Sequence, residues 1–142
     1  MNKDKIFGLF ESDSDVKSNV EETKKRILAF QNSPHSKLGM FTKLILNHFV
    51  FHDKLEKFLK KEEPSYDVES TREASEFVVF NRAWSYINQI NPEEESVENA
   101  VLTFNKKLLS KAINSSLSYF ESLEEYEKCA HIHKFQSILK KD

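Results

Sequence analysis

Apolar residues recur every three or four positions through most of the chain, which is the spacing of an α-helix that packs on one side. The longest regular run lies between residues 38 and 60, and a shorter one lies between residues 16 and 30. Similar patterns cover residues 70–90, 91–121 and 122–139. We therefore expect an all-α, single-domain antiparallel bundle of about five helices. The stripe of the second helix consists of Leu38, Phe41, Ile45, His48, His52, Leu55 and Leu59, widened by Leu44, Phe49, Phe51 and Phe58.

The width of that stripe predicts how the second helix is packed. The seam of a two-stranded coiled coil uses a narrow line of apolar positions, whereas this run has apolar side chains over a broader arc. The pattern therefore favours a helix that is buried among several neighbours. Six side chains from three of the predicted helices should be largely buried: Phe41, Ile45, Leu55, Trp84, Phe104 and Leu108.

Proline and capping residues mark the ends of the predicted helices. Pro34 stops the first helix, because the residue before a proline avoids the helical conformation. Asn91 followed by a proline is a strong helix start, and we expect this fourth helix to continue unbroken to about Glu121. Ser70–Glu73 and Ser122–Glu125 match the capping-box pattern, which predicts that the third and fifth helices begin there.

Composition supports the all-α interpretation and narrows the function classes. The 142 residues include 2 glycines and 3 prolines, too few for the many tight turns of a sheet protein. The formal net charge of −2 provides no global field for holding nucleic acid or an anionic membrane. No window approaches the ~18 consecutive apolar residues of a membrane span. The single cysteine excludes an internal disulfide and fits a reducing compartment, so we expect a cytoplasmic protein.

Residues 1–14 are expected to form an arm, followed by the helical bundle domain over residues 15–142. Four large apolar side chains of the arm lie outside any periodic segment and need a surface to cover them. The arm either folds back over the bundle or inserts into a partner protein or a second copy of the chain. The candidate protein-binding residues are therefore Ile6, Phe7, Leu9 and Phe10.

His48 and His52 lie one helical turn apart and are candidates for metal chemistry. Two histidines at positions i and i+4 can hold one metal ion from a single helix face. Cys129, His131 and His133 on the last predicted helix are candidates for further ligands if that helix packs opposite. The pair lacks the glutamate of the His-Glu-x-x-His protease motif, and we find no set of glutamates that suits a di-iron bundle. The alternative is a structural pair at the edge of the core, and we expect no bound metal or cofactor.

The other polar residues do not form a catalytic arrangement. Cys129 and His133 share a helix face, but no asparagine or aspartate that could orient the histidine is identifiable. The acidic runs lie at predicted helix starts, where they stabilise the helix dipole. Basic pairs such as Lys60 and Lys61 lie near acids at helix ends or on polar faces. No helix-turn-helix, zinc finger or glycine-rich phosphate loop is evident.

One family resemblance lies near the end of the chain. The segment Glu125-Tyr-Glu-Lys-Cys-Ala-His-Ile-His133 resembles the second-helix signature of the UVR motif, a helical hairpin that docks onto partner proteins. The chain departs from the motif because His133-Lys134 replaces its Arg-Asp pair and the preceding helix lacks the paired alanines. The resemblance implies a close-packed hairpin and protein binding, and it transfers no functional residue. The same stretch is similar to a tetratricopeptide hairpin at Leu117, Phe120, Tyr126 and Cys129.

The favoured function is a non-enzymatic protein-binding regulator: an adaptor, an inhibitor or an immunity-type protein that covers another protein. One alternative is a metal-binding helical bundle or small metalloenzyme that uses His48 and His52. Another is a nucleic-acid-binding protein that uses one helical face. The expected partner is another protein, with self-association as an alternative and no membrane.

Overall fold

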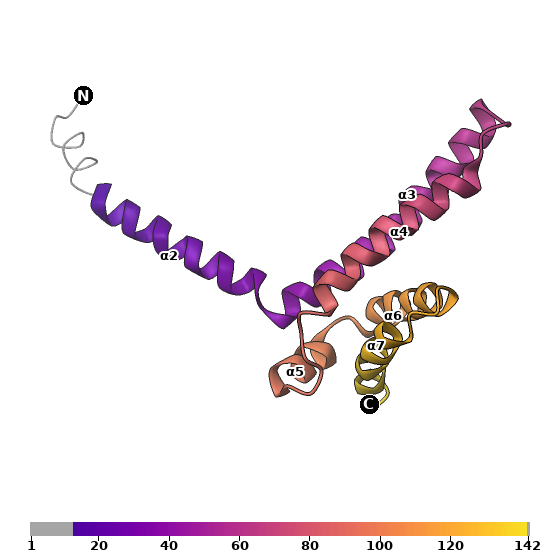
Figure 1. Cartoon of the computed structure of the whole chain (residues 1–142). Coiled ribbons are helices and arrows are strands. Elements are labelled where there is room, and N and C mark those ends of the chain that lie inside the picture. Colours follow the sequence, from indigo (N-terminus) through magenta and orange to yellow (C-terminus); the bar gives the residue numbers. More distant parts are fainter. Residues whose placement is uncertain (1–12, 142) are drawn as a thin grey trace, which may run out of the picture. The chain divides into compact units, whose positions relative to one another are not determined.

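The computed structural model describes residues 13–141, and every regular element in this part of the chain is a helix. Of these residues 83% are helical and none lies in a strand. The all-α class is therefore confirmed, with six helices in the described part where the sequence predicts about five. They are α2 (Asp13–Gln31), α3 (Pro34–Glu62), α4 (Val68–Ile87), α5 (Glu95–Thr103), α6 (Lys106–Ser122) and α7 (Tyr126–Leu139) (Figure 1).

Contacts divide the chain into two units between Ser33 and Pro34. The described part of the first unit is the single helix α2, which ends at Gln31 as the sequence predicts. Its apolar stripe between Val16 and Phe30 has no second described helix within this unit to pack on. The second unit contains α3 to α7, and Pro34 occupies the first helical position of α3, where the fixed φ of proline suits a helix.

The core of the second unit is built around α3, because α4, α5 and α6 all pack on it. Leu38, Phe41 and Ile45 have no exposed surface, and they follow one another along one side of α3. Helix α7 reaches the same core by packing on α5 and α6. The other side chains that are at most 1% exposed are Ala83, Ile87, Val97, Val101, Leu109, Ala112, Ile113, Ser116, Phe120, Ile132 and Phe135.

The prediction that several neighbours bury α3 holds for one side of the helix, where α4, α5 and α6 pack, but the outer part of its stripe is exposed. Phe51 is 66% exposed and Phe58 is 59% exposed. Helices α3 and α4 lie side by side as a long hairpin, and the end of this hairpin near the 63–67 loop projects beyond α6 and α7 (Figure 1). The neighbouring helices cover only one side of α3. The apolar stripe of α3 is wider than that side, so part of the stripe remains in solvent.

Helix α4 is capped three residues before the capping box that the sequence predicts at Ser70. The Asp67 carboxylate accepts hydrogen bonds from the backbone N–H of Ser70 at 3.1 Å and from Ser70 Oγ at 2.6 Å. These bonds lower the pKa of the Asp67 carboxyl. Ser70 is therefore a donor inside the first turn of α4, and Asp67 is the capping residue.

A break at Phe104 and Asn105 separates α5 from α6, so the predicted unbroken fourth helix is wrong. Phe104 has an extended backbone, with φ −73° and ψ 159°. The Asn105 side chain accepts a hydrogen bond from the backbone N–H of Leu108 at 3.1 Å, which is the geometry of a helix N-cap. The new helix changes which side chains face the core: Leu109 is fully buried, whereas Leu108 is 42% exposed.

Two other predicted helix starts are displaced. The Asn91 side chain accepts a hydrogen bond from the backbone N–H of Glu93 at 3.0 Å within a turn, and α5 begins at Glu95. Helix α6 continues through Ser122, and Glu124 then turns the chain with a positive φ of 59°. The segment predicted as a second capping box is therefore a helix end and a turn.

The six predicted core residues divide into three groups. Phe41 and Ile45 are fully buried, as predicted. Leu55, Trp84 and Phe104 are partly buried, and the last two pack against the core. The prediction for Leu108 is wrong because the break before α6 rotates that side chain toward solvent.

Helices α6 and α7 pack on each other after the turn at Glu124. Cys129 is buried, with its Sγ 4.0 Å from the carbonyl oxygen of Leu117. Tyr126 is 64% exposed. Close packing is a general property of two helices joined by a tight turn, so homology to the UVR or tetratricopeptide family stays a prediction.

Two alanine substitutions on α3 should separate its buried side from its exposed side. Phe41→Ala should lower the free energy of unfolding by about 3–5 kcal/mol, because it removes a fully buried ring and leaves a cavity. Phe51→Ala should lower it by less than about 1 kcal/mol, because that ring is mostly in solvent. Urea unfolding followed by circular dichroism measures both values. Equal losses would mean that Phe51 is also packed.

The break before α6 predicts a second stability difference. Asn105→Ala should lower the free energy of unfolding by about 1 kcal/mol, because it removes the acceptor that caps α6. Asn105→Ser keeps a capping oxygen and serves as the control, with a loss of a few tenths of a kcal/mol at most. The same urea measurement applies, and an alanine variant as stable as the serine variant would contradict a capping role.

Candidate functional site

His48 and His52 lie together on α3 and are both buried. Their rings stack with centroids 5.4 Å apart and an interplanar angle of 10°. His48 is 8% exposed and His52 is 7% exposed. Within the described part of the chain, the Nε2 atom of neither ring has a hydrogen-bond partner. The sequence therefore correctly places this pair at the core, but the hydrogen bond expected of each ring is absent at Nε2.

The histidine pair lines a groove of about 270 Å³ between α3 and α4, to which we refer as the histidine groove. Its charged side chains are Asp53 and Glu56 from α3 and Arg72 and Glu76 from α4. Arg72 forms a partly buried ion pair with Glu56 across the hairpin. Asp53 lies 3.1 Å from Lys57 on the same helix. Glu76 is the carboxylate of this groove that has no ion-pair or hydrogen-bond partner among residues 13–141.

The environment of the pair keeps His48 uncharged. Burial lowers the pKa of His48 below its ordinary value of 6.5, and the neighbouring His52 ring lowers it further. A buried cation would lose its hydration, and two imidazolium rings in contact would repel each other. His48 is therefore a neutral, polar element of the hairpin near pH 7.

A metal centre at this pair would need further ligands. Among the described residues no three histidine, cysteine, aspartate or glutamate side chains are grouped so that they could hold one metal ion. The His131 ring lies 2.9 Å from the carbonyl oxygen of Ile87, and the exposed His133 lies 3.9 Å from Glu121. The predicted ligands on the last helix are thus engaged elsewhere, and the pair supplies two ligands where zinc sites use three or four from the protein.

Cys129 has the environment of a core residue. Burial raises the pKa of its thiol, and the carboxylates of Glu121 and Glu125 raise it further. A thiol that stays protonated is a poor nucleophile. The His133 ring lies 3.1 Å from Gln136 Oε1. These contacts agree with the interpretation of Cys129 as a small buried apolar residue.

A second surface of the hairpin is apolar and faces solvent. A pocket of about 400 Å³ on this surface is lined mainly by Met40, Leu44 and Phe51 from α3 and by Val79 from α4. Phe58 lies two turns beyond Phe51 on the same side of α3. We refer to these five residues as the outer apolar surface. It continues the stripe whose other edge forms the core.

A row of lysines borders the outer apolar surface. Lys43 lines the same pocket as Met40 and Leu44. Lys54 and Lys61 follow Phe51 and Phe58 by three residues each, which places each lysine beside the preceding ring on the helix surface. All three lysines are exposed, and within the described part of the chain none forms an ion pair. The surface therefore combines exposed aromatic rings with an unpaired positive edge.

The candidate arm residues Ile6, Phe7, Leu9 and Phe10 lie outside the described residues. Sequence reasoning missed the outer apolar surface, because it assigned Phe51 and Phe58 to a buried stripe. The sequence nevertheless indicates the exposure of these rings. Lys54 and Lys61 lie within one helical turn of them, and lysine side chains are rarely buried. Among the described helices, none is both long enough and apolar enough to cross a membrane.

Comparisons of the whole chain with protein-family models, with curated proteins and with solved structures gave no match.

Burial of the histidine pair predicts a pH dependence of stability. The folded state holds the pKa of His48 below its unfolded value near 6.5, so the unfolded state binds the proton first as the pH falls. The contribution of His48 is complete above about pH 6.5 and is lost progressively below it. Urea unfolding between pH 7.5 and 5 should therefore give a declining free energy of unfolding.

The variant His48→Phe should flatten that decline, because phenylalanine fills the same space and does not titrate. His133→Phe is the control, because it removes an exposed histidine whose loss should leave the decline unchanged. If His48→Phe and the unmodified protein have parallel profiles between pH 7.5 and 5, the titration of His48 is not the cause.

Proposed function

We propose that the protein is a non-enzymatic protein-binding regulator whose α3–α4 hairpin docks onto another protein through the outer apolar surface. The observation that carries the proposal is the exposure of Phe51 and Phe58, at 66% and 59%, on a helix whose adjoining side forms the core. Large aromatic rings are costly to leave in water, and each contributes about 1.5–3 kcal/mol when it becomes fully covered. Such rings are common anchors of protein interfaces.

The lysine edge defines the chemistry of the partner. A partner segment that covers Phe51 and Phe58 would place its flanking residues next to Lys54 and Lys61. These two lysines have no ion-pair partner in the described chain. Carboxylates among the flanking residues would complement the charge and speed association. The partner is therefore a polypeptide with an amphipathic segment, whose apolar residues are flanked by aspartate or glutamate.

The N-terminal arm is a second proposed contributor. Ile6, Phe7, Leu9 and Phe10 form a short apolar anchor in the sequence, and their structure lies outside the described residues. In this proposal the arm adds contact area to a partner that is already positioned by the hairpin. The proposed site of action is the cytoplasm, because Cys129 is a free buried thiol that a reducing compartment would preserve.

The test begins with a photo-crosslinking amino acid placed at position 51 and, as the matched control, at position 50. Val50 is 59% exposed on the same helix, but it points to a different side. Crosslinking in cells, followed by mass spectrometry, should give a polypeptide product from position 51 and little from position 50. The crosslinked segment of that polypeptide should be apolar and acidic.

The dissociation constant for the identified partner then shows which residues contribute to binding. Phe51→Ala and Lys54→Glu should each raise the dissociation constant at least about tenfold, which is about 1.4 kcal/mol. Val50→Ala should leave it unchanged, and all three variants should keep the unfolding midpoint within a few degrees. Deleting residues 1–11 should weaken binding without lowering the thermal midpoint.

Three outcomes would overturn the proposal. The first is equal crosslinking from positions 50 and 51. The second is a product that is RNA or DNA, which would favour nucleic-acid binding through the lysine row. The third is a dimer of this chain, detected by sedimentation and lost in Phe51→Ala, which would make a second copy the partner.

A further inference from the structure

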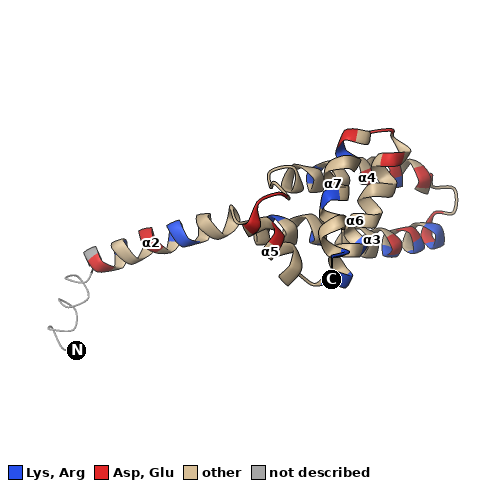
Figure 2. Cartoon of the chain, turned by 90° about the horizontal axis from the view of Figure 1, so that it is seen from below, with Lys and Arg blue, Asp and Glu red and all other residues tan. Residues whose placement is uncertain are grey.

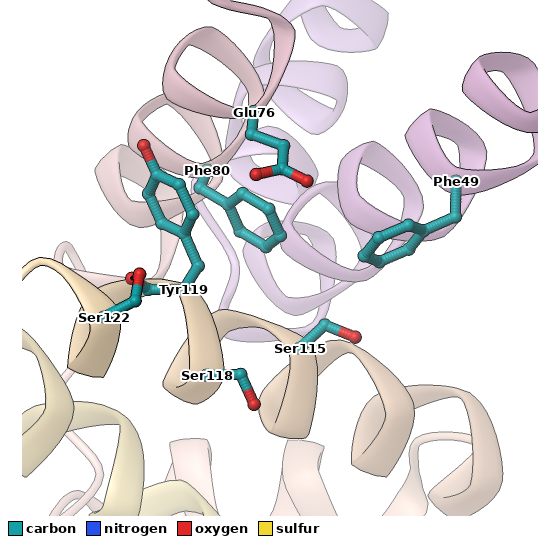
Figure 3. A pocket seen from close by; sticks show the side chains of 7 residues that line it. All are labelled: Phe49, Glu76, Phe80, Ser115, Ser118, Tyr119 and Ser122. Atoms are coloured by element: carbon teal, nitrogen blue, oxygen red, sulfur yellow. Dashed lines mark hydrogen bonds between the residues drawn. The ribbon is translucent and has the colours of Figure 1, made fainter. Parts of the chain in front are cut away.

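A second pocket lies on the other side of α3, where that helix meets α4 and α6. It has a volume of about 380 Å³ and is open to solvent. Three of its lining residues are aromatic, one is a carboxylate and three are serines. They are Phe49, Glu76, Phe80, Ser115, Ser118, Tyr119 and Ser122 (Figure 3). The pocket adjoins the histidine groove, and Phe49 and Glu76 line both.

The aromatic wall of this pocket is held in place by the core. Phe80 is 2% exposed, and its ring stacks on Tyr119 with centroids 4.4 Å apart and an interplanar angle of 13°. The ring of Phe120 meets Phe80 edge-on at 6.4 Å, from the buried side. Phe49 approaches Phe80 from α3 at 6.2 Å and is 42% exposed. The wall therefore combines fixed rings with one ring that remains accessible.

The Glu76 carboxylate extends into the space between Phe80 and Phe49 (Figure 3). Among residues 13–141, no basic side chain lines this pocket. Nearby cations are committed elsewhere: Arg72 pairs with Glu56 and Glu69, and Lys128 pairs with Glu125 at 3.3 Å. Within residues 13–141, Glu76 has no ion-pair or hydrogen-bond partner.

The negative charge of Glu76 affects the Tyr119 hydroxyl in the same pocket. Burial raises the pKa of the Tyr119 hydroxyl, and the charges of Glu76 and Glu125 raise it further. Tyr119 thus stays neutral, and its ring keeps the electron-rich face of an uncharged phenol. Aromatic faces and a carboxylate attract the same kind of group, a positively charged one.

We infer that this pocket binds an organic cation, with Glu76 as the counter-ion and the rings of Phe49, Phe80 and Tyr119 as its aromatic walls. The favoured cations are protonated amines and guanidinium groups. Their N–H donors match the carboxylate and the hydroxyls of Ser115 and Ser118, which make no hydrogen bond within the described part of the chain. An anion would be repelled by Glu76. The cation comes either from a free small molecule or from a lysine or arginine side chain that a polypeptide presents.

Titrations followed by two-dimensional ¹H–¹⁵N NMR can test this inference without a known partner. Butylammonium and butylguanidinium chloride serve as free cations, and 1-butanol at the same concentrations serves as the neutral control. Capped Gly-Lys-Gly and Gly-Arg-Gly peptides present the same groups on a backbone, with capped Gly-Met-Gly as their control. Sodium chloride keeps the ionic strength constant, because surface charges respond to salt.

The cations should shift the amide resonances of Glu76, Phe80 and Tyr119 in a saturable way, and the neutral controls should not. Glu76→Gln should weaken binding at least about tenfold, because it removes the charge and keeps the shape. Glu73→Gln removes an equal charge one turn earlier on α4, outside the pocket, and should change the affinity less than about twofold. Tighter binding of the peptides than of the free cations would identify a presented side chain as the source, and the reverse would identify a small molecule.

Several results would overturn the inference. One is the absence of saturable shifts at 100 mM cation in the folded protein. Another is equal shifts with 1-butanol, which would make the pocket a general apolar site. A third is unchanged affinity in Glu76→Gln together with an unchanged unfolding midpoint. These results would leave the docking proposal intact, because the outer apolar surface shares no residue with this pocket.

Discussion

Burial of one side of α3 is the interaction on which the rest of the second unit depends. Leu38, Phe41 and Ile45 are fully buried, and α4, α5 and α6 all pack on this helix. Helix α7 packs on α5 and α6, and its His131 ring lies 2.9 Å from the carbonyl oxygen of Ile87 in α4. Removing a ring such as Phe41 would therefore loosen several helix contacts together. The same arrangement leaves the remaining arc of α3 available for contacts outside the core.

The sequence predicts the helices well because their period reports which side is apolar, independently of what covers it. The sequence predicts poorly how much of each apolar stripe is buried by neighbouring helices. The same wide stripe occurs on a helix that is surrounded by neighbours and on a helix that keeps one apolar side in solvent. Phe51 and Phe58 belong to the second case. The break at Asn105 was also missed. The hydrogen bond from the Leu108 backbone N–H to the Asn105 side chain is local. The apolar residues before and after Asn105 nevertheless follow the helical period, so the pattern does not indicate a break.

The candidate sites depend on contacts between helices, so little of them could be predicted from the sequence. The pairing of His48 with His52 follows from their spacing, and its burial follows from the stripe. The aromatic pocket requires Phe49 from α3, Phe80 from α4 and Tyr119 from α6 to meet. No periodicity within one helix predicts which side chains of three helices will share a space.

The charged residues differ between the two solvent-facing sides of α3. Lys43, Lys54 and Lys61 border the outer apolar surface, whereas Asp53, Glu56 and Glu76 line the histidine groove on the other side. Figure 2 shows both signs of charge along α3 and α4, with few charged residues along α6. A protein with a net charge near zero can thus present local fields of opposite sign, which a whole-chain charge conceals.

The central claim is that α3 keeps the rings of Phe51 and Phe58 in solvent, next to its buried side. Hydroxyl-radical footprinting with mass spectrometry measures this directly in the isolated protein, by comparing oxidation rates of individual phenylalanines. The account predicts that Phe51 and Phe58 are oxidised several times faster than Phe41 in the folded state, and that the three rates converge in urea. Protection of Phe51 equal to that of Phe41 in the folded protein would contradict the account, because it would mean that the outer apolar surface is already covered.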